Sequence, residues 1–154
     1  MVYILCGLQA SGKSTYIKEH FPATTRVIDI FELQKYVSVY ASYYKMLEMV
    51  DLELTNSPEK DLVVENTFFK KKRRQEILDI IKKHNVKSTL IFCTAEDSVI
   101  IKRTEARYSD ASRDIDYINN NFLLQKSTLE PPEDNEGFDE FFVVNTSEQE
   151  SSTP

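Results

Sequence analysis

The sequence predicts an α/β fold in which a parallel sheet of five strands carries helices on both faces. Three observations lead to this prediction. Apolar segments typical of buried strands alternate with helical segments along the chain. A glycine-containing loop at 7–14 lies between the first strand and the first helix. Polar and charged residues follow the carboxyl ends of the strands, where parallel α/β sheets bind their ligands.

The N-terminal half of the chain contains three predicted strands and two predicted helical segments. The strands are expected at 2–6, 25–29 and 61–65. The first helix is expected at 13–20, stopped by Pro22. A longer helical region is expected from 30 to about 54, where Asn56-Ser57-Pro58 breaks the pattern.

The C-terminal half continues the alternation. Thr67 is predicted to cap a helix at 68–83, and Thr94, after a strand at 86–93, is predicted to cap the next helix. The remaining expectations are a polar break at 108–112, a helix from Ser112 to about Lys126, an acidic loop at 130–137 and a strand at 140–144. We therefore expect one domain at 1–146 and a polar tail at 147–154.

Composition narrows the function classes. A chain of 154 residues with 41% hydrophobic residues fits a single folded domain. The net charge of −6 is uneven, because eight acidic residues and no Lys or Arg follow Lys126. The mildly basic remainder does not predict strong nonspecific binding to duplex nucleic acid, although a short single-stranded end stays open as a substrate.

The sequence favours a cytoplasmic protein without membrane contact. Met1 leads straight into the first strand rather than a secretion signal, and no stretch reaches the ~20 apolar residues of a membrane span. Two cysteines, Cys6 and Cys93, argue against a disulfide framework. His20 and His84 lack partners for a zinc site and fall near predicted helix ends, where a positive charge is favourable.

The loop at 7–14 has the form G-x-x-x-x-G-K-[ST]. Its glycines let backbone N–H groups turn toward a phosphate, and the following helix adds a favourable dipole. Lys13 can reach the β- and γ-phosphates of ATP, and the Ser14 hydroxyl can bind Mg²⁺. We therefore assign nucleotide binding to Gly7, Leu8, Gln9, Ala10, Ser11, Gly12, Lys13, Ser14 and Thr15.

Other nucleotide-binding classes fit the sequence less well. No N-K-x-D motif for guanine is present, which argues against a GTPase. The length argues against the second half of a helicase and against a typical AAA+ module. What remains is mainly kinases that act on small molecules or polynucleotides.

Acidic and polar residues close the second and third predicted strands. Asp29 is a candidate general base that accepts the proton of an attacking hydroxyl, and its alternative role is a helix N-cap. Glu32 could share the catalytic role or simply occupy a first helical turn. The cluster Glu65-Asn66-Thr67 could hold a magnesium-bound water or orient the acceptor, or form a turn and a cap.

Arginines near the polar break suggest a lid. Arg103 and Arg107 lie four residues apart, so they share a helix face and could neutralise the charge that develops during phosphoryl transfer. The alternative is a solvated helix face. Arg113, beyond the break, is a weaker candidate.

Two further patterns have a plain and a functional interpretation. The basic run Lys70–Arg74 covers every face of its predicted helix and is either solvated or a contact for a phosphate-rich acceptor. Tyr36, Tyr40 and Tyr43 can form a helical stripe beside Tyr44, either as core packing or as a surface that stacks on an acceptor ring.

Together these motifs resemble the kinase domain of phage 5′-polynucleotide kinases and the wider group of small P-loop kinases that includes zeta toxins. The resemblance covers nearly the whole chain. It is carried, in order, by the phosphate loop with Ser14-Thr15, Asp29, Val63-Val64-Glu65-Asn66-Thr67 with Arg73-Arg74, and Lys102-Arg103 with Arg107.

The resemblance implies a P-loop NTPase three-layer sandwich with strand order 2-3-1-4-5, a short arginine lid, ATP and Mg²⁺. It matches Lys13 and Ser14 to phosphate and metal binding, and Asp29 to the general base, although a shifted alignment places Phe31 or Glu32 there. Arg107 matches the lid arginine on the transferred phosphate. Arg103 matches the preceding lid arginine, Asn66 an aspartate of the phage enzymes, and Asn145-Thr146 the rim of the adenine pocket.

The chain departs from the phage pattern at one informative position. Those enzymes have an arginine three residues after the base, where this chain has Glu32, or Lys35 if Glu32 is the base. We therefore predict an ATP-dependent kinase that phosphorylates an acceptor hydroxyl, with a polynucleotide 5′-hydroxyl as one acceptor. The alternatives are an accessory ATPase or switch without acceptor and a toxin-type sugar-nucleotide kinase. The sequence identifies neither the acceptor nor the oligomeric state.

Overall fold

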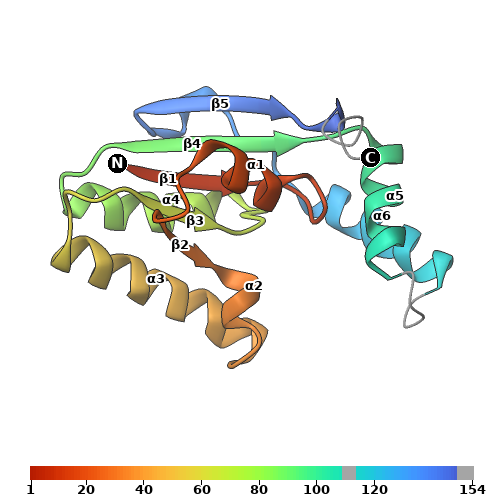
Figure 1. Cartoon of the computed structure of the whole chain (residues 1–154), viewed down its shortest axis with the longest axis horizontal. Helices are drawn as coiled ribbons and strands as arrows, with labels where there is room; N and C mark the ends of the chain where they lie inside the picture. The colour runs from red at the N-terminus through yellow and green to blue at the C-terminus, as the bar shows by residue number, and fades with distance from the viewer. Residues whose placement is uncertain (109–113, 149–154) are drawn as a thin grey trace.

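A computed structural model describes residues 1–108 and 114–148. In these residues five parallel strands form one sheet in the order β2-β3-β1-β4-β5 (Figure 1), which confirms the α/β fold and the implied strand order. The strands are β1 (Val2–Cys6), β2 (Arg26–Asp29), β3 (Leu62–Glu65), β4 (Ser88–Thr94) and β5 (Glu140–Asn145).

Helices cover both faces of the sheet and complete a three-layer sandwich. On one face, Val2 and Ile4 of β1 pack in a cluster with side chains of α3 (Val39–Asn56) and α4 (Lys71–Lys83). On the other face, Leu5 of β1 packs with Ile17 of α1 (Lys13–His20). Because alternate residues of a strand point to opposite faces, one apolar strand supplies both cores.

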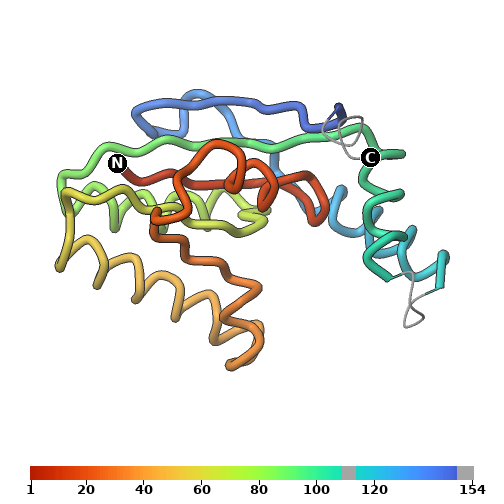
Figure 2. Tube along the Cα trace, in the orientation of Figure 1, coloured from red at the N-terminus to blue at the C-terminus, as the bar shows by residue number. Residues whose placement is uncertain are grey.

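The carboxyl ends of the strands face α5 (Asp97–Arg107) and α6 (Ile115–Thr128), as the trace in Figure 2 shows. A third cluster of buried side chains joins the phosphate loop to these helices through Leu8, Ala10, Ile100 and Phe122. This packing fixes the loop against α5 and α6, so the nucleotide site predicted from the sequence lies at the expected edge of the sheet.

The helical region predicted from 30 to 54 is two helices rather than one. A short helix, α2 (Ile30–Leu33), ends soon after β2, and α3 begins at Val39. The Ser38 hydroxyl accepts a hydrogen bond from the backbone N–H of Ala41 at 3.1 Å. This side chain caps α3 and so favours a new helix start over continuation of the first helix.

Three predicted N-caps are wrong or lie outside the described residues. The helix expected at Phe68 begins at Lys71, because Phe68 is buried with φ 47° and Thr67 stays in the preceding loop. Thr94 belongs to β4, and the helix after it begins at Asp97. Ser112 lies outside the described residues, and Asp114 caps α6 by accepting from the Tyr117 N–H at 2.8 Å.

Several smaller expectations can be compared with the structure. Cys6 and Cys93 are buried and unpaired, and His20 and His84 lie at the C-terminal ends of α1 and α4. Within the described ranges, no helix is long and apolar enough to cross a membrane. Of the predicted polar tail at 147–154, residues 149–154 lie outside the described part of the chain.

Candidate active site

The phosphate loop joins β1 to α1 through backbone conformations that favour glycine. Gly7 has φ 148° and Gly12 has φ 93°. A Cβ atom at Gly7 would lie 2.4 Å from the carbonyl oxygen of Cys93, so no larger residue fits there without moving β4. Gly12 directly precedes α1. The first N–H groups of this helix have no partner within the helix and so lie at the phosphate loop.

Lys13 is buried at the base of this loop. Its ammonium donates hydrogen bonds to the carbonyl oxygens of Gly7 at 2.9 Å and Leu8 at 2.8 Å. Burial lowers the pKa of Lys13, and the negative charge of Glu65 opposes that shift. The loop carbonyls therefore hold the ammonium within the loop that is predicted to bind phosphate.

Ser14 and Glu65 form the polar centre of the site. The Ser14 hydroxyl donates to Oε1 of Glu65 at 2.7 Å, which joins the start of α1 to the end of β3. Glu65 is buried, and burial raises its pKa while the hydrogen bond from Ser14 lowers it. The sequence predicted that the cluster Glu65-Asn66-Thr67 could hold a magnesium-bound water or orient the acceptor, and the position of Glu65 at a strand end was the signal.

A small cleft of about 260 Å³ opens above this pair. Arg107, the last residue of α5, lines it, as the lid interpretation requires. The lining residues are Gln9, Ala10, Lys13, Ser14, Phe31, Glu65, Arg107 and Tyr108. We call this space the phosphate cleft, because it combines the phosphate loop with two cationic side chains.

The two candidate bases differ in their surroundings. Asp29 pairs in register with Glu65 across β2 and β3, and its Oδ1 accepts from the backbone N–H of Phe31 at 2.8 Å. It therefore caps α2 at the edge of the site. Glu32 forms an ion pair with Lys35 at 2.8 Å, and its side chain is 61% exposed.

Arg103 is not part of a solvated helix face. Its guanidinium donates to the Ala10 carbonyl at 3.2 Å and to the hydroxyl and carbonyl oxygens of Thr146 at 3.0 and 2.6 Å. Thr146 is buried, and its hydroxyl donates to the Ser11 carbonyl at 2.6 Å. Arg103 therefore ties the phosphate loop to the end of β5, a contact that the sequence did not predict.

The other predicted site residues are less central. Asn145 ends β5, and its side chain accepts from the Ser147 N–H at 2.9 Å. Thr15 is exposed on α1. Asn66 is buried and accepts from the Thr67 N–H at 2.7 Å, so it shapes the loop after β3. Arg113 lies outside the described residues.

A second and larger cleft of about 860 Å³ lies beside the phosphate cleft. The two share Gln9 and Phe31. We call the larger space the aromatic cleft. Its lining residues are Gln9, Ile30, Phe31, Gln34, Val39, Tyr40, Tyr43, Tyr44, Asn66, Thr67, Phe68, Phe69, Lys70, Arg73, Asn121, Leu124, Gln125 and Thr128.

The tyrosines predicted as a stripe have different surroundings. Tyr43 is buried, whereas Tyr36 and Tyr40 are 84% and 74% exposed, so core packing does not explain the whole stripe. Tyr40, Tyr43 and Tyr44 line the aromatic cleft, and Tyr36 does not.

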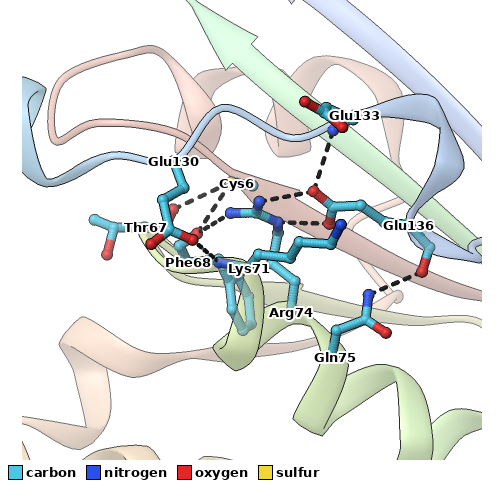
Figure 3. A network of polar contacts seen from close by, with 9 residues as sticks. All are labelled: Cys6, Thr67, Phe68, Lys71, Arg74, Gln75, Glu130, Glu133 and Glu136. Carbon is cyan, nitrogen blue, oxygen red and sulfur yellow. Dashed lines mark hydrogen bonds and ion pairs between the residues drawn. The ribbon is translucent and has the colours of Figure 1, made fainter.

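The basic run also divides, because Arg74 is fully buried and not solvated. Its guanidinium forms two hydrogen bonds with the Glu136 carboxylate, at 2.8 and 2.7 Å, and donates to the Phe68 carbonyl at 2.8 Å (Figure 3). Glu136 belongs to a short 3₁₀ helix, η1 (Asp134–Glu136), within the segment predicted as an acidic loop. No pattern in the sequence indicates that this acidic residue pairs with the basic run.

Neighbouring contacts extend this network around the loop after β3. Glu130 accepts from the Lys71 N–H at 2.9 Å and donates its own N–H to the Phe69 carbonyl at 2.7 Å. Figure 3 shows Cys6 beside Thr67 and Phe68, whose carbonyls its thiol approaches. The segment at 129–137 therefore holds in place a loop that lines the aromatic cleft.

Comparison with known proteins identifies relatives by sequence and by fold. A family model described as an AAA domain matches residues 2–132. No curated protein matches the sequence significantly. We argued from the length of the chain against a typical AAA+ module, and we did not predict a match to an AAA domain family.

Three solved structures illustrate the shared fold. A protein of Chloroflexus aurantiacus with a provisional kinase description has 16% identity and a TM-score of 0.74 over 99% of this chain and 91% of that one. Kti12 of Chaetomium thermophilum, in complex with ADP-AlF3, has 18% identity and a TM-score of 0.67 over 98% and 92%. The APS kinase CysC of Mycobacterium tuberculosis, in complex with AMPPNP and APS, has 14% identity and a TM-score of 0.58 over 97% and 91%.

Proposed function

The chain belongs to the AAA domain family, and on that premise we propose that it is an ATP-dependent kinase that transfers the γ-phosphate of ATP to an acceptor hydroxyl. One observation carries the proposal. The phosphate cleft, with Lys13 and Arg107 in its wall, opens directly beside a cleft large enough for a second substrate, and the two share Gln9 and Phe31. A simple ATPase needs only the first of these spaces.

The residues divide the work of phosphoryl transfer among them. Loop N–H groups at the start of α1 bind phosphate oxygens, and Lys13 turns from the loop carbonyls toward the β- and γ-phosphates. Arg107 neutralises charge on the transferred group. Positioning and charge stabilisation together provide most of the catalysis in this reaction class.

Asp29 is the proposed general base. It ends β2 next to Glu65 and lies two residues before Phe31, which lines both clefts. An acceptor hydroxyl at this boundary would pass its proton to the Asp29 carboxylate. Glu32 is a poorer candidate, because its carboxylate is exposed and paired with Lys35.

Ser14 and Glu65 fit a magnesium ion. Hydroxyl and carboxylate oxygens are the ligands that Mg²⁺ prefers, and the ion is usually held by one or two such groups together with substrate phosphates. The 2.7 Å separation of Ser14 Oγ and Glu65 Oε1 brings two such oxygens together beside the phosphate loop. When bound, Mg²⁺ would offset negative charge on the β- and γ-phosphates.

Two of the structures with a similar fold contain nucleotides of the ATP class, which supports ATP as the phosphate donor. The Kti12 and APS kinase structures contain ADP-AlF3 and AMPPNP, and we extend ATP binding to this chain by analogy of fold. Among acceptors, the resemblance to phage 5′-polynucleotide kinases favours a polynucleotide 5′-hydroxyl. The two unpaired cysteines favour a reducing compartment, and we propose the cytoplasm.

Transfer of radiolabelled γ-phosphate tests the proposal. The purified protein is incubated with labelled ATP and Mg²⁺, together with 5′-hydroxyl DNA, 5′-hydroxyl RNA, nucleosides, sugar nucleotides or sugar acids. A kinase moves the label into at least one acceptor, faster than it releases inorganic phosphate. Slow release of phosphate with every acceptor would instead identify an accessory ATPase or switch.

A further inference from the structure

This inference rests on the proposed function and extends it to the second substrate. We propose that the aromatic cleft is the acceptor site and that it selects an acceptor in which a planar aromatic ring is linked to an anionic group. Three features of the cleft carry this proposal. They are its exposed tyrosine rings, a guanidinium held in place in its wall, and the charge of its lining.

The tyrosine rings form an aromatic wall. Tyr40 and Tyr44 are 74% and 49% exposed, and their ring centroids lie 5.1 Å apart. The Tyr44 ring also meets the buried Tyr43 ring edge-on at 5.4 Å. Exposed aromatic rings gathered in one cleft mark a binding surface, and a planar ring gains stacking energy there that a sugar or an aliphatic chain does not.

Arg73 provides a positioned cation. Its guanidinium carbon lies 4.0 Å from the centre of the Tyr43 ring, and its Nη1 lies 3.3 Å from the Glu76 carboxylate. Tyr43 and Glu76 thus hold one side of a planar group that has five N–H donors. Because the side chain is still 40% exposed, it can donate to an anion in the cleft.

The charge of the lining agrees with an anionic ligand. Lys70 and Arg73 line the cleft, and among its described lining residues there is no aspartate or glutamate. The acidic groups near these cations, Glu76 and Glu130, pair with them without lining the cleft. The α6 residues that line the cleft are Leu124 and three uncharged polar residues, Asn121, Gln125 and Thr128, which can hydrogen bond to the ring edge or a sugar.

The junction with the phosphate cleft orients such an acceptor. Gln9 is held in place, because its N–H donates to Gln125 Oε1 at 3.2 Å and its own Oε1 accepts from Gln125 Nε2 at 3.1 Å. An acceptor with its ring against Tyr40 and Tyr44 would therefore present its hydroxyl past Gln9 and Phe31, toward Lys13. A volume of about 860 Å³ suits either a free nucleotide or the terminal unit of a nucleic acid strand.

Equilibrium binding tests the proposal without requiring turnover. The full chain is saturated with Mg²⁺ and a non-hydrolysable ATP analogue and then titrated with four probes. These are a pyrimidine nucleoside monophosphate, the same nucleoside without phosphate, ribose phosphate without a base, and a short single-stranded oligonucleotide with a 5′-hydroxyl. We expect the probes with both ring and phosphate to bind at least ~10-fold more tightly than either partial probe. Whichever probe binds more tightly, the mononucleotide or the oligonucleotide, identifies the source of the ring and the anion.

Matched variants assign the binding to the cleft. Arg73→Gln should weaken binding of the phosphate-bearing probes ~10-fold and leave binding of the bare nucleoside unchanged. Tyr44→Leu should weaken binding of every probe that has a ring. The controls are Lys72→Gln, in the same basic run, and Tyr36→Leu, in the same tyrosine group, because neither residue lines the cleft. Thermal unfolding of each variant shows that the fold is intact.

The outcomes separate this proposal from the proposed function. Equal affinities for ribose phosphate and nucleotide, or equal losses of affinity in the control variants, would overturn the proposal that the aromatic cleft is the acceptor site. Phosphoryl transfer to an acceptor without a ring, unaffected by Tyr44→Leu, would overturn it while leaving the kinase intact. Cleft-dependent binding of ring and phosphate without any transfer would support the site and contradict the kinase.

Discussion

The two clefts of this molecule are built in opposite ways. Almost all of the phosphate cleft comes from one stretch of chain at 7–14 and from the ends of β3 and α5. The aromatic cleft draws on α2, α3, the loop after β3, α4 and α6. A contiguous motif therefore supplies much of the phosphate cleft, whereas the aromatic cleft is assembled from segments far apart in the sequence.

The supports of the two clefts differ as well. Backbone conformations at Gly7 and Gly12 and the contacts of Arg103 shape the phosphate cleft. The wall of the aromatic cleft depends on the Arg74–Glu136 ion pair, whose partners lie 62 positions apart in the sequence. The phosphate cleft therefore starts from a contiguous loop that distant residues hold in place, whereas the aromatic cleft is assembled throughout from segments far apart in the sequence.

The largest expected effect is on stability and separates these two kinds of support. Glu136→Gln leaves the buried Arg74 guanidinium without its counter-charge, which should cost about 3–5 kcal/mol of unfolding free energy. Asp134→Asn, an exposed neighbour in the same 3₁₀ helix, is the control. Urea unfolding gives both values, and equal stability of the two variants would show that the ion pair does not support the loop.

The next effect concerns the boundary between the clefts. Asp29→Asn should reduce phosphoryl transfer ~10³-fold while ATP still binds, because an amide cannot accept the proton of the hydroxyl. It should keep the cap of α2, since the amide oxygen can accept from the Phe31 N–H. Glu32→Gln should retain most activity. The reverse pattern in a transfer assay would assign the base to Glu32.

The phosphate cleft alone is tested at Lys13. Lys13→Ala removes the cation predicted to follow the γ-phosphate, and transfer should fall ~10²-fold. Lys18→Ala, an exposed basic residue on the same helix, should leave turnover unchanged. Because Lys13 is buried, circular dichroism of the variant confirms its fold. Normal turnover in Lys13→Ala would contradict the assignment of the loop.

The smallest expected effects distinguish the two arginines of α5. Arg107→Lys keeps the charge and loses the planar fork, so turnover should fall ~10-fold with a smaller change in ATP affinity. Arg103→Lys loses contacts to Ala10 and Thr146, which shape the loop, and should raise the KM for ATP more than it lowers kcat. Steady-state kinetics with varied ATP distinguishes these two patterns. Normal kinetics in both variants would show that α5 contributes neither to ATP binding nor to catalysis.

The sequence predicts what local chemistry determines. The pattern at 7–14, the apolar strands and the polar residues at strand ends were enough for the fold and for the position of Lys13 and Ser14. The spacing of Arg103 and Arg107 before a polar break was the separate signal for Arg107, which lines the phosphate cleft. The start of α4 was misplaced because Phe68, which follows the predicted N-cap Thr67, adopts φ 47° and packs in the core. Sequence spacing contains no information about such a tertiary contact.

The burial of Arg74 and Glu136 was missed for a related reason. A run of five basic residues is typical of a solvated helix face, and an acidic segment is typical of a loop. Their pairing requires the chain to bring positions 74 and 136 together, which neither local pattern indicates. A wall of the aromatic cleft depends on this contact, so the sequence left the chemistry of that cleft open.

A structure of the ternary complex with Mg²⁺, a non-hydrolysable ATP analogue and the best acceptor tests the central claim most directly. We predict that the γ-phosphate lies between Lys13 and Arg107, and that the acceptor lies in the aromatic cleft with its hydroxyl about 3–3.5 Å from the phosphorus. The nucleotide base in the aromatic cleft, or the acceptor bound away from Gln9 and Phe31, would contradict the claim that the two clefts serve the two substrates of one transfer.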